Sequence, residues 1–247
     1  MKDNFSAESD NYAKNRPSYP GEFFQYLNTL INGTENAWDC ATGNGQVAVK
    51  ISTLFKNVYA TDISEQQVGN AVQLSNIHYS VQPAEATDFR DNFFDLIIVA
   101  QAVHWFDFEK FYAEVKRTAK TNSLLSIIGY GRLKTDPRIE SVIEKLYTEI
   151  VVIYWDKERR YIEEDYRTIP FPFEEISVPD FESRYNWTLE HLIGYLGTWS
   201  AVKHYIKQNG NDPVALIRHD LADAWQQADT RTITFPLLTR IGKVNVM

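Results

Sequence analysis

Residues 93–102, FFDLIIVAQA, are apolar at almost every position, and this segment constrains the fold more than any other. A strand with one solvated face alternates apolar and polar side chains, whereas a strand that is apolar on both faces is buried on both. Such strands occur in parallel sheets that carry helices on both sides. We therefore predict that this segment forms a central parallel strand.

The first half of the chain repeats a strand-then-helix order around this segment. The sequence predicts further strands over 36–40, 58–61, 78–86 and 122–131, and helices over 21–31, 46–55 and 108–120. Ser64, with Gln67 three residues on, is typical of a helix start, and Asp107 is expected to cap another helix. This alternation predicts an α/β fold with a doubly wound, mostly parallel sheet.

The second half has a different pattern, which we interpret as additions to one domain that spans residues 1–247. Residues 1–20 form a polar arm, and residues 131–176 form a helical insertion that ends in a proline-broken connector over 169–175. Strands are predicted over 181–187 and 231–244, with one helix over 188–207 between them. The arm and the insertion are expected to cover the site.

The segment WDCATGNGQVAVK, residues 38–50, predicts a turn of small residues between a strand and a helix. Such a turn brings a ligand close to the backbone N–H groups at a helix N-terminus. Gly43, Gly45 and Ala48 fit a dinucleotide-binding spacing, which is weak evidence alone. Asp62 ends the next strand, where a carboxylate can bind both ribose hydroxyls of an adenosine cofactor.

Asp39 distinguishes between the cofactors that such a turn can bind. A carboxylate at the root of the loop repels the pyrophosphate of a dinucleotide and attracts a cation. S-adenosylmethionine carries a sulfonium and an ammonium group, so Asp39 favours this cofactor. Ala41 is small enough to stand where glycine is usual.

Composition narrows the classes of partner. The formal net charge of −8 and the pI near 5.2 argue against a nucleic-acid-binding protein. Cys40 is the single cysteine, the five histidines show no metal-ligand spacing, and the longest apolar run is too short to span a bilayer. We expect a cytoplasmic protein, monomer or homodimer, that binds neither nucleic acid, membrane nor metal.

Eight stretches match one known family, and together they span nearly the whole chain: YAKNRPSYP, WDCATGNGQVAV, VYATDISEQQ, AEATDF, FFDLIIVAQAVHWFD, FYAEVKRTAK, TWSAVKHY and FPLLTRIGKV. In these stretches the chain resembles the class I S-adenosylmethionine-dependent methyltransferases of type 11, and within them the trans-aconitate methyltransferase group. Two departures stand out. Ala41 replaces the usual glycine, and Thr121, Asn122 and Ser123 replace the usual proline-glycine-glycine turn.

The resemblance implies a Rossmann-like methyltransferase fold and a role for each matching residue. On the methionine side of the cofactor it places Asp39, Ala41, Gly43, Gly45, Ala100 and Gln101. Near the ribose and the adenine it places Asp62, Ile63, Ala84 and Glu85. From the arm, Tyr12, Arg16 and Tyr19 are expected to close over the site.

His104 and Trp105 are expected to face the transferred methyl group, His104 as a candidate base and Trp105 as a positioning residue. A small-molecule acceptor is implied, with O-methylation of a carboxylic acid as one reaction. A carboxylate needs no base and favours a cation such as Arg16, whereas a hydroxyl or amine would use His104. Two alternatives stay open: a nicotinamide-dependent oxidoreductase, and a binding protein without transferase activity.

Overall fold

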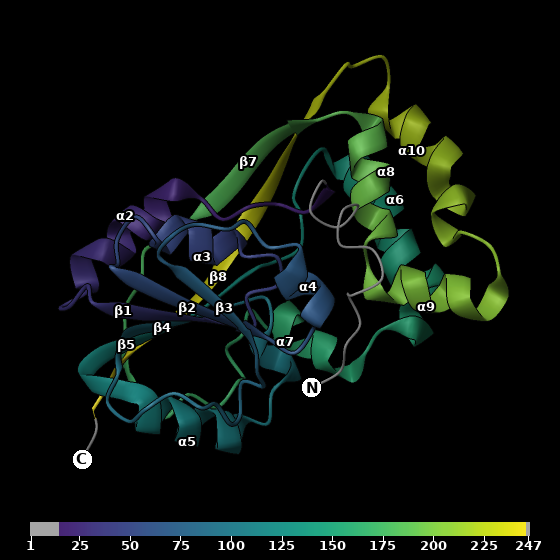
Figure 1. Cartoon of the computed structure of the whole chain (residues 1–247). Coiled ribbons are helices and arrows are strands. Elements are labelled where there is room, and N and C mark those ends of the chain that lie inside the picture. Colours follow the sequence, from purple (N-terminus) through teal and green to yellow (C-terminus); the bar gives the residue numbers. More distant parts are fainter. Residues whose placement is uncertain (1–14, 246–247) are drawn as a thin grey trace.

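The computed structural model describes residues 15–245 and has a twisted sheet at its centre (Figure 1). The strand order is β3-β2-β1-β4-β5-β8-β6, and β7 pairs with β8 beside this path. Strands β1 to β5 are parallel, whereas β8 runs antiparallel to β5, β6 and β7. The strands are β1 (Asn36–Cys40), β2 (Asn57–Asp62), β3 (Ile77–Val81), β4 (Phe94–Ala100), β5 (Ala119–Tyr130), β6 (Glu174–Ile176), β7 (Glu182–Trp187) and β8 (Arg231–Val244). The predicted doubly wound, mostly parallel sheet is confirmed.

Strand β4 is buried on both faces, as its sequence predicts. Leu96 and Ile98 belong to one hydrophobic cluster, which includes residues of α2 (Gly21–Leu30) and α3 (Gln46–Ile51). Ile97 and Val99 belong to another, which includes residues of α5 (Phe108–Thr118). Alternate residues of a strand point to opposite faces. The continuous apolar run of β4 therefore fills two cores at once.

The helix after β1 is shorter than predicted. We expected residues 46–55, but α3 ends at Ile51, and Ser52 and Thr53 turn back on it. The Ser52 hydroxyl donates to the Val49 carbonyl at 2.8 Å, and the Thr53 hydroxyl to the Lys50 carbonyl at 3.0 Å. Such side-chain bonds compete with the helix ladder and favour its end. The predicted caps are confirmed, since Ser64 starts α4 (Glu65–Gly69) and Asp107 starts α5.

Most helices of the second half form a group of their own, beside the ends of the central strands (Figure 1). They are α6 (Pro137–Lys145), α8 (Leu189–Gly197), α9 (Ser200–Asn209) and α10 (Arg218–Trp225). These four share a hydrophobic cluster with Trp187 of β7 and Phe235 of β8. The short helix α7 (Arg160–Glu163) lies apart from them, and its Ile162 belongs to the hydrophobic cluster of α5. The helical part therefore extends beyond the predicted insertion, and residues 174–176 form strand β6 where we predicted only a connector.

The single helix predicted over 188–207 is wrong, because the chain breaks at Thr198 and Trp199 into α8 and α9. The Thr198 hydroxyl donates to the Tyr195 carbonyl at 2.6 Å, and Trp199 has an extended backbone with ψ 137°. The Thr198 carbonyl, released from the helix, accepts a hydrogen bond from Arg16 at 2.9 Å. This break ties the helical group to the arm.

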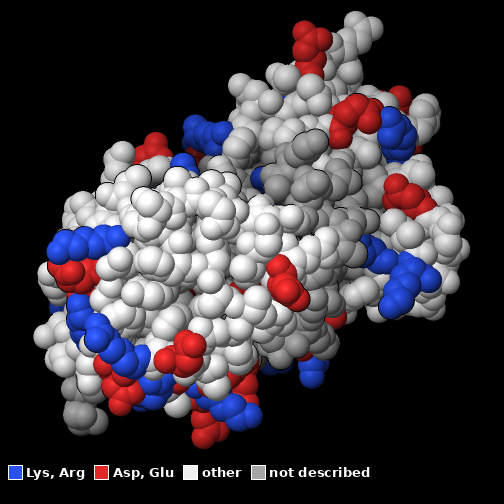
Figure 2. Space-filling view, viewed as in Figure 1, with Lys and Arg blue, Asp and Glu red and all other residues white. Residues whose placement is uncertain are grey.

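Acidic and basic side chains are intermixed over the face of the molecule shown in Figure 2, and lysines and arginines lie there in small separate groups. Within residues 15–245, no helix combines the length and the apolar character that crossing a bilayer requires.

Candidate active site

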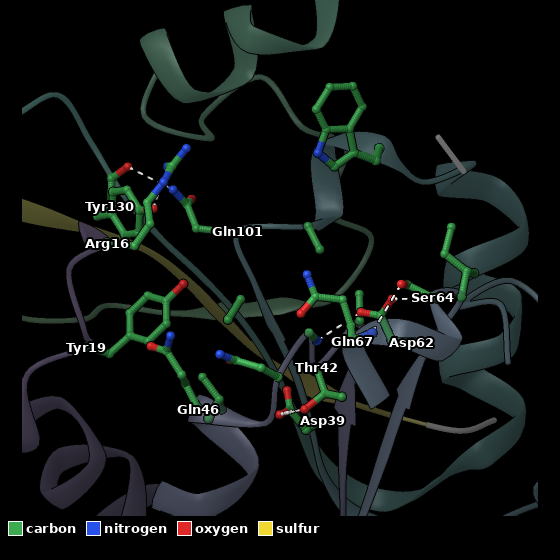
Figure 3. A pocket seen from close by; sticks show the side chains of 18 of the residues that line it. Arg16, Tyr19, Asp39, Thr42, Gln46, Asp62, Ser64, Gln67, Gln101 and Tyr130 are labelled. Carbon is green, nitrogen blue, oxygen red and sulfur yellow. Dashed lines mark hydrogen bonds between the residues drawn. The ribbon is translucent and has the colours of Figure 1, made fainter. Parts of the chain in front are cut away.

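A pocket opens where the carboxyl ends of β1, β2 and β4 meet, the edge at which doubly wound sheets bind ligands (Figure 3). Figure 3 shows Asp62, Ser64 and Gln67 on one side of the pocket, Arg16, Tyr130 and Gln101 across from them, and Asp39 with Thr42 below. The described residues that line it are Arg16, Pro17, Tyr19, Asp39, Ala41, Thr42, Gly43, Asn44, Gln46, Val47, Asp62, Ile63, Ser64, Gln67, Ala100, Gln101, Ala102, Trp105 and Tyr130.

The loop after β1 has a left-handed backbone at three of the predicted small residues. Ala41 has φ 56°, Gly43 has φ 58° and Gly45 has φ 85°. A side chain in this region costs roughly 1–2 kcal/mol of backbone strain, which glycine avoids. The position of Ala41 thus explains why glycine would be usual there, and non-glycine residues in such conformations concentrate at functional sites.

Asp39 is 1 % exposed and is the more deeply buried of the two carboxylates among the described residues that line the pocket. Its Oδ2 accepts a hydrogen bond from the Thr42 hydroxyl at 2.5 Å, while its Oδ1 has no hydrogen-bond partner among residues 15–245. Burial raises the pKa of Asp39 to about 7, and the nearby charge of Asp62 adds to this, while the Thr42 hydroxyl and the Ala48 backbone oppose it. A buried carboxylate with an unmatched oxygen suits a cationic ligand group.

Asp62 connects the loops that follow β1 and β2. Its Oδ2 accepts from the backbone N–H of Gly43 at 2.9 Å, and its Oδ1 accepts from the backbone N–H of Ser64 at 2.9 Å. A carboxylate has about four acceptor sites in all, and Asp62 lines the pocket, where a ligand hydroxyl can reach it. Asp62 therefore combines a structural role with a position suited to binding a ribose.

Gln101, at the end of β4, has a strained left-handed backbone with φ 55°. The hydroxyl of Tyr166 donates to its side-chain Oε1 at 3.1 Å. Gly129 of β5 allows this approach, because a Cβ at that position would lie 2.5 Å from the Gln101 Oε1 and 2.7 Å from the Tyr166 oxygen. Tyr166 was not predicted as a site residue, since nothing in the sequence near 166 marks it.

His104 lies beside this network rather than in the cofactor pocket. His104 is 6 % exposed, and its Nδ1 is 3.3 Å from the Tyr166 hydroxyl. Burial lowers the pKa of His104 to about 3, and the positive charge of Arg159 contributes. The imidazole is therefore neutral at any physiological pH.

The neutral state of His104 gives a testable pH dependence of stability. Its pKa is about 3 in the folded chain and near 6.5 when unfolded, so the unfolded chain binds an extra proton as pH falls below 6.5. The folded state thereby loses stability on acidification. Between pH 7 and pH 5, the free energy of unfolding measured with urea should fall by about 2 kcal/mol more in the native chain than in His104→Gln. Equal losses in the two proteins would contradict a buried neutral His104.

The structure brings together most of the residues that the sequence predicted, but not all of them. Gly45, Ala84 and Glu85 do not line the cofactor pocket. Gly45 is the N-terminal cap of α3, Ala84 is buried in a hydrophobic cluster, and Glu85 accepts from the backbone N–H of Asp107 at 3.2 Å. Tyr12 lies outside the described residues.

Arg16 anchors the arm against both halves of the molecule. It donates to the Tyr130 hydroxyl at 2.7 Å and to the Thr198 carbonyl at 2.9 Å. Tyr19 lines the same pocket, and its ring centroid is 6.3 Å from that of Tyr130. The described part of the arm therefore covers the pocket, as expected.

Sequence reasoning missed several polar residues that line the pocket: Thr42, Asn44, Gln46 and Gln67. Thr42, Asn44 and Gln46 stand within the loop or at the first position of α3, so their nearness to the predicted turn could have indicated them. For Gln67 the sequence predicts a role at the helix start, and the structure adds a place in the pocket wall. Among residues 15–245, no group of His, Cys, Asp or Glu side chains is arranged to hold a metal ion.

Comparisons with known proteins agree on one family. A family model described as a methyltransferase domain matches residues 38–127. A Dictyostelium discoideum protein named as a methyltransferase is 30 % identical over 98 % of this chain and 95 % of its own length. A structure from Anaeromyxobacter dehalogenans, described as a type II methyltransferase, is 35 % identical with a TM-score of 0.86, covering 94 % of this chain and 99 % of that one. A Saccharomyces cerevisiae protein named as S-adenosylmethionine-dependent is 25 % identical over 51 % of this chain and 47 % of its own length.

Proposed function

Since this chain belongs to the class I S-adenosylmethionine-dependent methyltransferases, we propose that it methylates a small carboxylic acid on oxygen. The cofactor is S-adenosylmethionine, which supplies an electrophilic methyl group on a sulfonium. The observation that carries the cofactor assignment in the structure is the buried, unmatched Oδ1 of Asp39 in the wall of the pocket. Because the chain belongs to this family, we set aside the alternative of a nicotinamide-dependent oxidoreductase.

The residues of the pocket fit the cofactor in charge and in hydrogen-bonding capacity. Asp39 would hold the cationic methionine end, and Asp62 would accept hydrogen bonds from the ribose hydroxyls. Trp105 lines the same pocket and offers a ring face to a cation or a wall to the acceptor. The protein's contribution to the reaction is to orient the acceptor in line with the methyl group and to exclude water.

A carboxylate acceptor agrees with the state of His104. A hydroxyl or amine acceptor requires a base, and a base works best when its pKa lies near the operating pH. Burial holds the pKa of His104 at about 3, which makes it a weak base. A carboxylate is nucleophilic without proton transfer, so this site favours an acid as the acceptor.

We propose that the acceptor is a free small molecule and that the protein acts in the cytoplasm as a monomer or a homodimer. The net charge of −8 and the intermixed charges of Figure 2 support a small acceptor over a nucleic acid. The single cysteine, Cys40, is buried and accords with a reducing compartment.

The test is methyl transfer from labelled S-adenosylmethionine to a panel of small carboxylic acids. A methyl ester releases labelled methanol on mild alkaline treatment, whereas N-methyl and ether products do not. The proposal predicts alkali-labile, volatile label with at least one acid. Label found only in alkali-stable products would show another acceptor atom and overturn the carboxylate assignment.

A further inference from the structure

A second cavity adjoins the cofactor pocket, and the two share Arg16, Gln101 and Trp105 in their walls. Its remaining described lining comes from η2 (Val103–Trp105), residues 155–162 and the junction of α8 and α9: His104, Trp155, Asp156, Arg159, Ile162, Trp199 and Ser200. A third cavity, about 250 Å³ in volume, continues beyond it and shares Arg159 and Trp199 with it. Arg16 therefore lies where the second cavity meets the cofactor pocket, whereas Arg159 and Trp199 lie where the second cavity meets the third.

Arg159 is held in place through its stem and its Nε, which leaves the end of its guanidinium available. It lies in η5 (Lys157–Arg159) and is half-buried. Its Nε donates to the Tyr147 hydroxyl at 3.0 Å, and its Cζ is 4.9 Å from the ring centroid of Trp155 and 5.6 Å from that of Tyr147. Its two terminal nitrogens make no hydrogen bond among residues 15–245. A fixed guanidinium fork of this kind matches the two oxygens of a carboxylate or a phosphate.

Trp199 provides an independent observation at the same place. Trp199 is 5 % exposed. Its indole Nε1 lies close enough to the Tyr195 hydroxyl to oppose the rise in the Tyr195 pKa that burial causes, but it makes no well-formed hydrogen bond among residues 15–245. A buried donor without a well-formed hydrogen bond is costly and calls for a partner. Trp199 lines the second and third cavities, as Arg159 does. Two sets of unmatched donors thus stand in the walls of the same two cavities.

The charge of the second cavity also favours an anion. Arg16 and Arg159 both line it, and Asp156 is the one carboxylate among its described lining residues, whereas the third cavity holds Arg132 and Arg159 with Glu140 and Glu144. The Asp156 carboxylate has His204 nearby, with 3.9 Å between the imidazole Nδ1 and its Oδ2. The positive charge of Arg159 reaches His104, where it helps to lower the pKa of the imidazole.

We infer that Arg159 and Trp199 form an anion subsite that binds an oxyanion of the acceptor at the end remote from the transferred methyl group. Arg159 is then the residue that determines specificity for the acceptor. The inference rests on the proposed function, since it takes the second cavity as the acceptor site. If a carboxylate is methylated at the cofactor end, the acceptor carries one oxyanion at each end. A carboxylate and a phosphate share the chemistry that this fork recognises.

The test is calorimetric titration of the protein loaded with S-adenosylhomocysteine, using linear dicarboxylates from succinate to adipate and the matching monocarboxylates. We expect the native chain to bind at least one dicarboxylate about tenfold or more tightly than its monocarboxylate, as a charge-assisted bond provides. In Arg159→Met the ratio of the dicarboxylate affinity to the monocarboxylate affinity should fall to within twofold of one. The affinity for S-adenosylhomocysteine should stay unchanged. Titration with 3-phosphonopropionate beside succinate shows which oxyanion the fork prefers.

Arg160→Met is the matched control, because Arg160 is the exposed neighbour in sequence and stacks on Tyr161 with 4.8 Å between its Cζ and the ring centroid. This variant should keep the native ratio. If Arg159→Met melts well below the native chain, Arg159→Lys and Trp199→Phe replace it, and each should lower the ratio several-fold. An unchanged ratio in these variants, or a native chain that does not distinguish dicarboxylates from monocarboxylates, would overturn the subsite.

The titration requires no turnover, so its outcome is independent of the proposed reaction. A preserved preference for dianions without any methyl ester formed would reject carboxylate methylation and keep the subsite. Ester formation with monocarboxylates alone, without a preference for dianions, would reject the subsite and keep the reaction.

Discussion

Replacing Asp62 with alanine is expected to weaken the binding of S-adenosylhomocysteine by on the order of 100-fold, or about 2.7 kcal/mol. The carboxylate already orders two loops through the backbone N–H groups of Gly43 and Ser64, and its side chain lines the pocket. The variant loses the ribose acceptor and the loop order together. Each hydrogen bond to a charged group contributes roughly 1.5–3 kcal/mol, which makes this loss larger than that of a neutral contact.

The Asp62→Ala measurement pairs calorimetric titration with thermal unfolding of the unliganded protein. We expect a moderate decrease in the unfolding temperature, because the backbone N–H groups of Gly43 and Ser64 lose their acceptor while the core is left untouched. Asp229→Ala is the control, since Asp229 is an exposed carboxylate in the turn before β8. A dissociation constant for S-adenosylhomocysteine that stays within twofold of the native value would refute the ribose assignment.

Asp39→Asn is expected to affect stability and binding in opposite directions. Burial raises the pKa of Asp39 to about 7 in the folded chain, against an ordinary value of 3.8. Between about pH 4 and pH 7 the folded state keeps a proton that the unfolded chain has lost, so Asp39 lowers stability as pH rises through this window. The neutral amide removes this penalty. The unliganded variant should therefore be more stable than the native chain at pH 8.

The affinity for the cationic cofactor should increase as pH rises, whereas the contribution of Asp39 to stability decreases. A cation beside Asp39 favours the ionised carboxylate, so affinity should rise with pH up to about 7, and binding at pH 6 should release close to one proton. Asp39→Asn should abolish that proton release and weaken the binding of S-adenosylmethionine by roughly 30-fold or more at pH 8. Titrations at pH 6 in two buffers with different ionisation enthalpies measure the protons released. Proton release that persists in the variant would show that another group titrates.

The part of the site that could be predicted from sequence is the part that follows from the sheet. Asp39 and Asp62 stand at the ends of strands whose apolar patterns are clear, and parallel strands bring their carboxyl ends to one edge. The small residues between β1 and α3 predict a close approach of backbone to ligand. At the ends of these strands and in the loop before α3, the local sequence predicts the local structure. The position of the pocket therefore follows from the order of the strands and helices.

The acceptor side could not be predicted, because it depends on packing between distant segments. Tyr166 reaches Gln101 from 65 residues away, and Arg159 is positioned by stacking on Trp155 and Tyr147 rather than by any motif. The break at Thr198 follows from a side-chain bond and a contact with Arg16, neither of which has a periodic signal. Residues 1–247 as one domain stay a prediction.

The most direct test of the central claim is a calorimetric titration of the native chain with S-adenosylhomocysteine, run beside NADH and NADPH. Asp39 and Asp62 together predict micromolar binding of S-adenosylhomocysteine and no measurable binding of either nicotinamide cofactor. Binding of NADH or NADPH without binding of S-adenosylhomocysteine would contradict the role assigned to Asp39, and with it the account of the pocket.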